Sequence, residues 1–159
     1  MATTSFLLNV SHSQVAVFDS GLQQPFNGWT ERHVNQGFAW RPGSVSFATI
    51  EEAGRHSVSL DVVSGNVGVS PEAIRVIQTP FEVPQTGAIE IASASDSVPF
   101  SLPSGTYALR FEYFCASALS DPGIRFLFMK MENPSFEILR ADSGLSAKAG
   151  DLFLSASPA

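Results

Sequence analysis

The chain has 159 residues, of which 44% are hydrophobic and 15% are charged. This length is enough to bury a core, and the low charge combined with high apolar content excludes an intrinsically disordered chain. Nine basic and fifteen acidic side chains give a net charge of −6, and DNA or RNA phosphates repel an acidic protein. We therefore expect one domain over residues 1–159 that binds no nucleic acid.

Short runs of strand-forming residues, separated by turn residues, follow one another along the chain. In Arg55–Val63 and in Thr106–Phe114 apolar side chains alternate with polar ones, which is typical of a half-buried strand. The middle of Ile124–Met131 is apolar throughout, which predicts a strand buried on both faces. Ala73–Val83 is interrupted by Pro80. The other expected strands are Phe6–Val10, Ser13–Asp19, Phe38–Arg41, Ser44–Thr49, Ala88–Ala92, Val98–Leu102 and Phe136–Arg140.

One segment departs from the strand pattern. Thr30 stands where a helix N-cap would, and Gly37 where a helix would stop, so we expect a short helix near residues 30–36. Leu152–Leu154 is either a last strand or a loose tail, and residues 155–159 are expected to be frayed. Many short strands with regularly spaced turns indicate an all-β fold, an antiparallel β-sandwich with this one helix in a connection.

No group of residues indicates catalysis or metal binding. The histidines, His12, His33 and His56, lack the spacing of metal ligands on one element, and Cys115 has no second cysteine to pair with. We expect Cys115 to be a buried, inert thiol and His56 to be a hydrogen-bonded core residue. An enzyme would need His12 or His33 to converge on carboxylates within a cleft. The sequence therefore predicts a protein that is not an enzyme and binds no cofactor.

Nothing in the sequence indicates export or a membrane span. Residues 1–8 lack a basic segment followed by a long apolar one, so they do not resemble a signal peptide. No apolar run approaches the roughly 20 residues of a membrane helix. We expect a cytoplasmic protein without membrane insertion, and the oligomeric state is left open.

Acidic residues gather in one part of the chain. Between residues 82 and 121 there is one basic residue, Arg110, and the acids are Glu82, Glu90, Asp96, Glu112 and Asp121. Glu90 and Glu112 occupy outward positions, so neighbouring strands would give one sheet an acidic outer face. Such a face binds a basic partner or is merely solvated. Rim charges accelerate encounter, whereas affinity needs anchors such as Trp29, Trp40 or Arg41.

Several ordered segments resemble a known family, the competence protein J family of DNA-entry nuclease inhibitors. The resemblance covers roughly residues 7–115. The matching segments are Ser11–Asp19, Trp29–Thr30, Gly37–Trp40, Ser44–Phe47, Pro80–Val83, Ile89–Ser93 and Phe100–Leu109. From Pro122 onwards the chain is longer than the family pattern. The resemblance implies no particular set of inhibitory residues in this chain.

This resemblance implies that the chain inhibits a nuclease by forming a complex with it. Similar domains look like immunity proteins encoded beside nuclease toxins of bacterial secretion systems, such as type VI secretion. The implied partner is then a basic nuclease or DNase toxin, because a nuclease that holds DNA presents a positive groove. The alternative is a small-ligand or carbohydrate-binding module, which would use Trp29, Trp40 and Tyr113 in one aromatic pocket.

Overall fold

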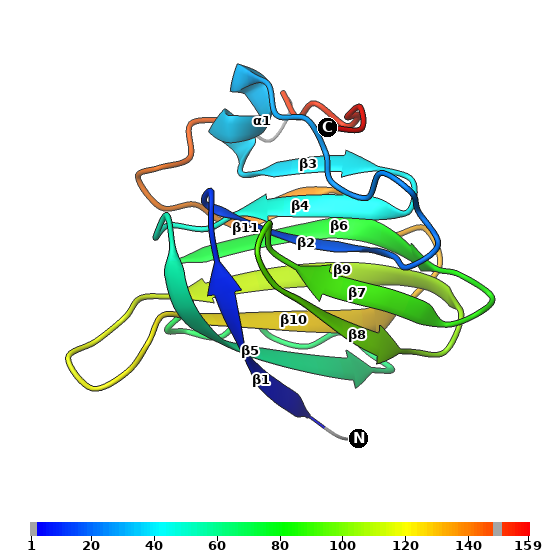
Figure 1. The fold of residues 1–159 in the computed structure, drawn as a ribbon, viewed down its shortest axis with the longest axis horizontal. Coiled ribbons are helices and arrows are strands. Elements are labelled where there is room, and N and C mark those ends of the chain that lie inside the picture. Colours follow the sequence, from blue (N-terminus) through cyan, green and yellow to red (C-terminus); the bar gives the residue numbers. More distant parts are fainter. Residues whose placement is uncertain (1–2, 148–150) are drawn as a thin grey trace.

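The structure is a computed structural model that describes residues 3–147 and 151–159. Within these residues it contains eleven strands and one short helix (Figure 1). The elements are β1 Thr4–Val10, β2 Gln14–Asp19, α1 Glu31–Gln36, β3 Phe38–Arg41, β4 Ser44–Ala48, β5 Gly54–Val63, β6 Arg75–Val83, β7 Ala88–Ala92, β8 Ser97–Ser101, β9 Gly105–Phe114, β10 Gly123–Lys130 and β11 Glu137–Arg140.

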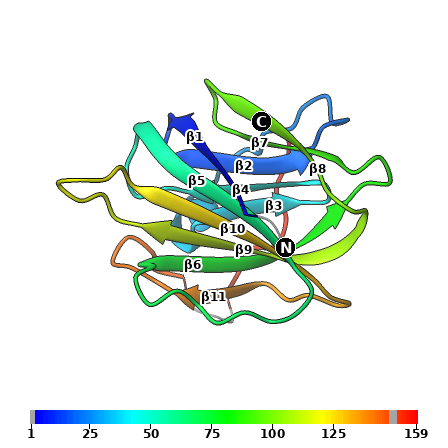
Figure 2. The same ribbon diagram turned by 90° about the horizontal axis from the view of Figure 1, so that it is seen from below.

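The strands form two sheets that pack face to face. The six-stranded sheet has the order β1-β5-β10-β9-β6-β11, and the five-stranded sheet has the order β3-β4-β2-β7-β8 (Figure 2). Neighbouring strands run antiparallel, except that β10 is parallel to β5. The predicted all-β sandwich is therefore confirmed, with one parallel pair inside the six-stranded sheet.

Aromatic side chains fill the space between the two sheets. Phe47 of β4 lies flat on Phe111 of β9, with ring centroids 4.7 Å apart and planes 4° from parallel. Phe126 of β10 contacts both rings, at 6.0 and 5.9 Å. The inward direction predicted for alternate side chains of β9 is confirmed, since they join this core, but the strand is not half-buried, because residues 107–113 are all buried. The two-sided burial predicted for β10 is confirmed, because residues 126–129 are all buried.

Strand β6 continues through Pro80, although the sequence suggested an interruption there. Strand β11 pairs with β6 only through Val76–Gln78, so the outer edge of β6 has no hydrogen-bonded neighbour strand at Pro80. A proline, which has no N–H group, is tolerated at such an edge. The carbonyl of Pro80 accepts a hydrogen bond from Trp40 Nε1 at 2.8 Å.

The connection between β5 and β6 covers the outer face of the six-stranded sheet. Val67 in this connection packs on a small apolar cluster that includes Leu127 and Met129. Glu112 is fully buried beneath it and accepts hydrogen bonds from the N–H and the hydroxyl of Ser70, at 3.1 and 2.9 Å. Arg125 Nη1 lies 3.5 Å from the Glu112 carboxylate. The connection is thus held by buried charges as well as by apolar contact.

Helix α1 has the caps that the sequence predicted. Thr30 and His33 form a reciprocal capping box, in which each side chain accepts a hydrogen bond from the other residue's N–H. Gly37 ends the helix with φ of 85°, and a Cβ there would lie 2.9 Å from the side chains of Ile77 and Leu145. Position 37 therefore requires glycine for its backbone conformation and for space.

The C-terminal residues are held against the fold, so the expectation of a frayed end is wrong. The Gly28 N–H donates to the Ser157 carbonyl at 2.8 Å, and the Ala159 N–H donates to the Phe26 carbonyl at 2.9 Å. Residues 152–154 form no strand, but the Gln36 side chain bonds both backbone groups of Phe153. The segment from residue 151 accordingly runs beside α1 (Figure 1).

Cys115 is exposed, contrary to the buried thiol that we expected. Strand β9 ends at Phe114, and the chain then leaves the sheet as a projecting loop before β10 (Figure 1). The burial of Tyr113 therefore does not extend to Cys115. His56 is buried as expected, with Nε2 2.9 Å from the Tyr113 hydroxyl.

The first testable prediction concerns the ion pair between Arg75 and Asp142, whose atoms Nε and Oδ1 are 2.6 Å apart. Burial raises the pKa of the Asp142 carboxyl. Hydrogen bonds from Arg75 and from the Gly144 N–H act in the opposite direction and outweigh burial, so the pKa lies below the ordinary 3.8. Because the folded-state pKa is the lower one, this carboxylate stabilises the fold above about pH 3.8. That stability is lost as the pH falls through the folded-state pKa.

We expect Asp142→Asn to lower the free energy of unfolding at pH 7 by roughly 2 kcal/mol, since buried Arg75 loses its charged acceptor. Urea unfolding between pH 7 and pH 2.5 measures the gap in free energy of unfolding between wild type and variant. The gap should narrow as the pH falls below about 3.8. A gap of constant size over that range would contradict the assignment.

The second prediction compares two glutamates on opposite outer faces. Glu112→Gln should destabilise the fold by about 3 kcal/mol, because Arg110 and Arg125 lose their buried counter-charge. Glu90→Gln, on half-buried β7, should change stability by less than about 0.5 kcal/mol. Urea unfolding at pH 7 measures both variants, and equal effects would show that Glu112 is not the buried counter-charge described above.

Candidate functional site

The acidic residues singled out from the sequence do not form one shared face. Glu90 lies on β7 in the five-stranded sheet, whereas Glu112 lies on β9 in the six-stranded sheet, so the expected common acidic face is wrong. Both side chains do point outward, but on opposite sides of the sandwich. Glu112 is moreover buried by the connection that carries Ser70. Alternation within a strand predicts the direction of a side chain but not the sheet to which the strand belongs.

Two further acids lie apart from these. Glu82 is exposed near the end of β6 and accepts a hydrogen bond from the Thr106 hydroxyl at 2.7 Å. Asp121 lies in the loop before β10, where its carboxylate is 2.8 Å from Arg55 Nε. The structure therefore brings together only Glu90 and Asp96 of the predicted acidic set.

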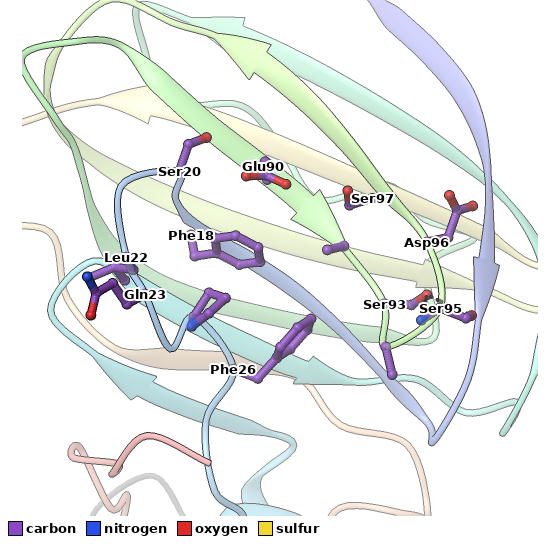
Figure 3. A pocket seen from close by; sticks show the side chains of 13 residues that line it. Phe18, Ser20, Leu22, Gln23, Phe26, Glu90, Ser93, Ser95, Asp96 and Ser97 are labelled. Atoms are coloured by element: carbon purple, nitrogen blue, oxygen red, sulfur yellow. Dashed lines mark hydrogen bonds between the residues drawn. The ribbon is translucent and has the colours of Figure 1, made fainter.

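Glu90 and Asp96 line a concavity on the outer face of the five-stranded sheet (Figure 3). Its volume is about 430 Å³. Phe18 of β2 is paired directly with Glu90 of β7 and faces Phe26 from the connection after β2, with ring centroids 5.7 Å apart. The other lining residues are small or hydroxylated for the most part: Ser20, Leu22, Gln23, Pro25, Ala92, Ser93, Ala94, Ser95 and Ser97. The concavity thus combines aromatic side chains with an acidic and hydroxyl-rich rim.

The apolar part of this concavity was missed by sequence reasoning. In β2, Val15 and Val17 face the core, while Ala16 and Phe18 face outward and form a second small cluster with Ala92. Leu22 and Phe26 pack against that cluster. The uninterrupted apolar run from Val15 to Phe18 was the available signal, because a strand with one solvated face would alternate. That signal did not identify the segment that covers the outer face.

Asp96 has a structural role in addition to its place on the rim. Its Oδ2 accepts the N–H of Asn9 at 3.0 Å, and the Asn9 carbonyl accepts a hydrogen bond from the Ser93 hydroxyl. These bonds join β1, at the edge of one sheet, to the β7–β8 turn of the other. Within the described residues, no hydrogen bond to the Glu90 carboxylate is present. Glu90 is therefore the acid of the concavity that is available to a partner.

The three predicted anchor residues have different surroundings. Trp40 packs against the core and lies edge-on to Phe136, at 5.0 Å between centroids. Arg41 Nε donates to Asn27 Oδ1 at 2.7 Å, and its guanidinium also bonds the carbonyl of Gln24. Trp29 is half-buried, and its Nε1 donates to Gln14 Oε1 at 3.0 Å. Of these three side chains, that of Trp29 lines two surface hollows.

The aromatic pocket of the alternative function is not formed. Tyr113 is fully buried and bonds His56, while Trp40 donates to Pro80 inside the fold. Trp29 lies near α1 and lines hollows that contain neither of the other two. Trp29, Trp40 and Tyr113 therefore do not line a common hollow in the part of the chain that the structure describes, and nothing there favours a carbohydrate-binding module.

An enzyme would need His12 or His33 to converge on carboxylates within a cleft, and neither does so among the described residues. His33 is held by Thr30 on one side and by the Ser155 carbonyl, 2.8 Å from Nε2, on the other. His12 is exposed in the turn between β1 and β2. Among residues 3–147 and 151–159, no three His, Cys, Asp or Glu side chains come together as metal ligands. No helix over the same residues is long and apolar enough to cross a membrane.

Basic side chains are used within the fold, whereas many acids face solvent. Arg75 and Arg125 bind carboxylates, and Arg110 and Arg140 bind backbone carbonyls of the β5–β6 connection. Burial lowers the pKa of the Arg110 guanidinium, although Glu112 opposes this effect. The exposed acids are Glu31, Glu51, Glu52, Glu72, Glu82, Glu132, Glu137 and Asp151. Among the described residues, exposed acids therefore outnumber the exposed bases, which are Arg32, Arg55 and Lys130.

Comparisons with known proteins agree with the fold and identify the family. The chain is 27% identical over 103 residues to a DNA-entry nuclease inhibitor of Bacillus subtilis (strain 168), which covers 64% of this chain and 75% of that protein. The crystal structure of ComJ from Bacillus subtilis, described as an inhibitor of the DNA-degrading activity of NucA, superposes with a TM-score of 0.71. It is 22% identical and covers 80% of this chain and 96% of that chain.

A second solved structure, described as crocagin biosynthetic gene J, superposes with a TM-score of 0.61 at 14% identity. It covers 83% of this chain and the whole of that chain. Both solved structures share the β-sandwich fold. The model of the competence protein J (ComJ) family matches residues 7–129, which extends beyond the range of the resemblance seen in the sequence. The chain therefore belongs to the competence protein J family.

Proposed function

We propose that this chain inhibits a DNA-degrading nuclease by binding directly to it, and that it is not itself an enzyme. Its relative in Bacillus subtilis is a DNA-entry nuclease inhibitor, and the ComJ structure of the same fold is described as inhibiting NucA. Membership of the ComJ family supports the same role for this chain.

The observation that supports the proposal most is that basic side chains bind groups within the protein, whereas acidic side chains face solvent. Most described arginines bind the protein's own acids and carbonyls, while acidic side chains remain at the surface. A nuclease needs a positive groove for DNA, so an acidic surface attracts it and can cover that groove. The same surface repels nucleic acid, which fits a partner that is a basic protein.

The concavity around Glu90 is the part of this surface that we propose to contact the nuclease. It offers a carboxylate to which no described residue donates a hydrogen bond, next to the ring of Phe18, so a lysine or arginine of the partner can bind the acid and pack its stem on the aromatic side chain. Asp96 and the half-buried side chains of Trp40 and Arg41 then support this surface through their hydrogen bonds within the fold.

The third prediction is inhibition at a near-stoichiometric ratio. Purified protein should abolish plasmid cleavage by NucA of Bacillus subtilis or by a nuclease encoded beside this chain's gene. Because charge steers the encounter, the association rate should fall at least about tenfold between 50 and 500 mM salt. Gel-based cleavage and stopped-flow binding measure the two effects.

Matched charge reversals test the contact. Glu90→Lys should weaken inhibition at least about tenfold, whereas Glu132→Lys, in the exposed connection after β10, should leave it within about threefold. If stoichiometric protein leaves cleavage by both nucleases unchanged, the proposed function is wrong. If both reversals have equal effects, inhibition occurs but not through the concavity.

We further propose that the nuclease is a secreted antibacterial DNase toxin, such as one exported by type VI secretion. In this role the chain is an immunity protein that acts in the cytoplasm of the producing cell. An acidic surface favours fast association with a basic nuclease, which protection from a DNase requires.

The fourth prediction follows from this role. Bacteria that express the neighbouring nuclease in the cytoplasm should lose viability, and co-expression of this chain should restore it. The Glu90→Lys variant should restore it less well than the Glu132→Lys variant, because the second reversal leaves the concavity intact. Plating efficiency is the measurement. A nuclease that is harmless in the cytoplasm would exclude the immunity role while leaving inhibition itself intact.

A further inference from the structure

A second hollow lies at the other end of β2, on the same face of the five-stranded sheet as the concavity. The concavity adjoins Phe18, near the end of β2, and the second hollow adjoins Gln14, where β2 begins. Its volume is about 290 Å³. The lining residues are His12, Ser13, Gln14, Trp29, Val34 and Ala48.

The aromatic wall of this hollow is held in place before any partner arrives. The Trp29 indole donates to Gln14 Oε1 at 3.0 Å, and its ring lies edge-on to His33, with centroids 6.3 Å apart. His33 in turn stacks on Phe153 of the C-terminal segment, at 4.7 Å. A rigid, half-buried tryptophan binds a partner with little loss of side-chain entropy, which is typical of an interface hot spot.

Val34 adds an exposed aliphatic side chain to the same hollow. The buried side chains of α1 are His33 and Gln36, whereas Val34 is 56% exposed. An aliphatic side chain at this exposure contributes nothing to the core, and beside Trp29 it extends the apolar surface of the hollow. The hollow therefore fits an apolar side chain better than a charged or sugar ligand.

Two exposed acids, Glu31 and Glu52, lie close to residues that line the hollow. Glu31 precedes Val34 by three residues and so lies on the same side of α1. Glu52, exposed in the β4–β5 connection, accepts the N–H of Ser13 through its carbonyl at 2.9 Å. The one arginine of α1, Arg32, is placed over the Phe153 ring and bonds the Asp151 carbonyl. A partner that fills the hollow would therefore carry basic residues around its apolar group.

We propose that the Trp29–Val34 hollow is an anchor site for the nuclease, which inserts an apolar side chain flanked by lysine or arginine residues. This inference rests on the proposed function and adds a second contact to it. Residues 14 and 18 are roughly 13 Å apart along β2. An interface of standard size, which buries about 800 Å² on each partner, spans both the hollow and the concavity.

The fifth prediction uses two exposed aliphatic residues as a matched pair. Val34 and Leu7 are each 56% exposed, the first in the hollow and the second on β1. Against a nuclease that wild-type protein inhibits, Val34→Lys should raise the inhibition constant at least about 30-fold, as expected for a hot-spot residue of about 2 kcal/mol. Leu7→Lys should change it less than about threefold. Both should unfold at the wild-type temperature.

A second pair of variants tests the charged rim without touching apolar contacts. The Glu31→Gln, Glu52→Gln double variant should slow association with the same nuclease at least about threefold at 50 mM salt. The Glu132→Gln, Glu137→Gln double variant, which removes equal charge from exposed positions after β10, should not. Comparable effects of Val34→Lys and Leu7→Lys would overturn the anchor site while inhibition by wild-type protein still upheld the proposed function. A wild-type chain without inhibition would overturn both.

Discussion

Contact between the inner faces of the two sheets is the constraint from which the rest of the molecule follows. The stacked rings of Phe47 and Phe111, with Phe126 against both, form the centre of that contact. Because side chains alternate along a strand, burying these rings determines which side chains of β4, β9 and β10 face inward and which face outward. The other side chains of these strands then lie on the outer faces of the two sheets, where a partner can reach those that no connection covers.

The outer faces of the two sheets are covered to different extents. Over the six-stranded sheet, the β5–β6 connection seals a charged layer in which Glu112 binds Ser70 and lies beside Arg125. Charges buried in this way cannot meet a partner, and their removal costs stability. Over the five-stranded sheet, the segment around Phe26 covers only the middle of β2 and leaves a hollow at each end. One outer face is therefore covered and the other is partly open, so the two faces differ in the side chains that they present to a partner.

The partly open outer face of the five-stranded sheet is consistent with both the family relationship and the negative charge of the chain. Arginines serve the fold, by binding Asp142, Asp61 and the carbonyls of the β5–β6 connection, and acids are left for solvent or for a partner. The C-terminal segment, which lies beyond the residues matched by the family model, contributes Phe153 to the aromatic row behind Trp29. This segment thereby shapes the face that we propose to bind the nuclease.

Local chemistry was sufficient for the elements of the fold. Thr30 and Gly37 predicted the helix, the alternation in β9 predicted the directions of its side chains, and the apolar run in β10 predicted burial on both faces, because these properties follow from the local order of residues. Which strands became neighbours, and which outward residues remained open, depended on contacts between distant segments. Glu90 and Glu112 looked equivalent in sequence, yet β7 and β9 joined different sheets, and the loop carrying Ser70 buried one of the two. Only the tertiary structure decided that, since burial of an outward side chain depends on the connection that crosses it.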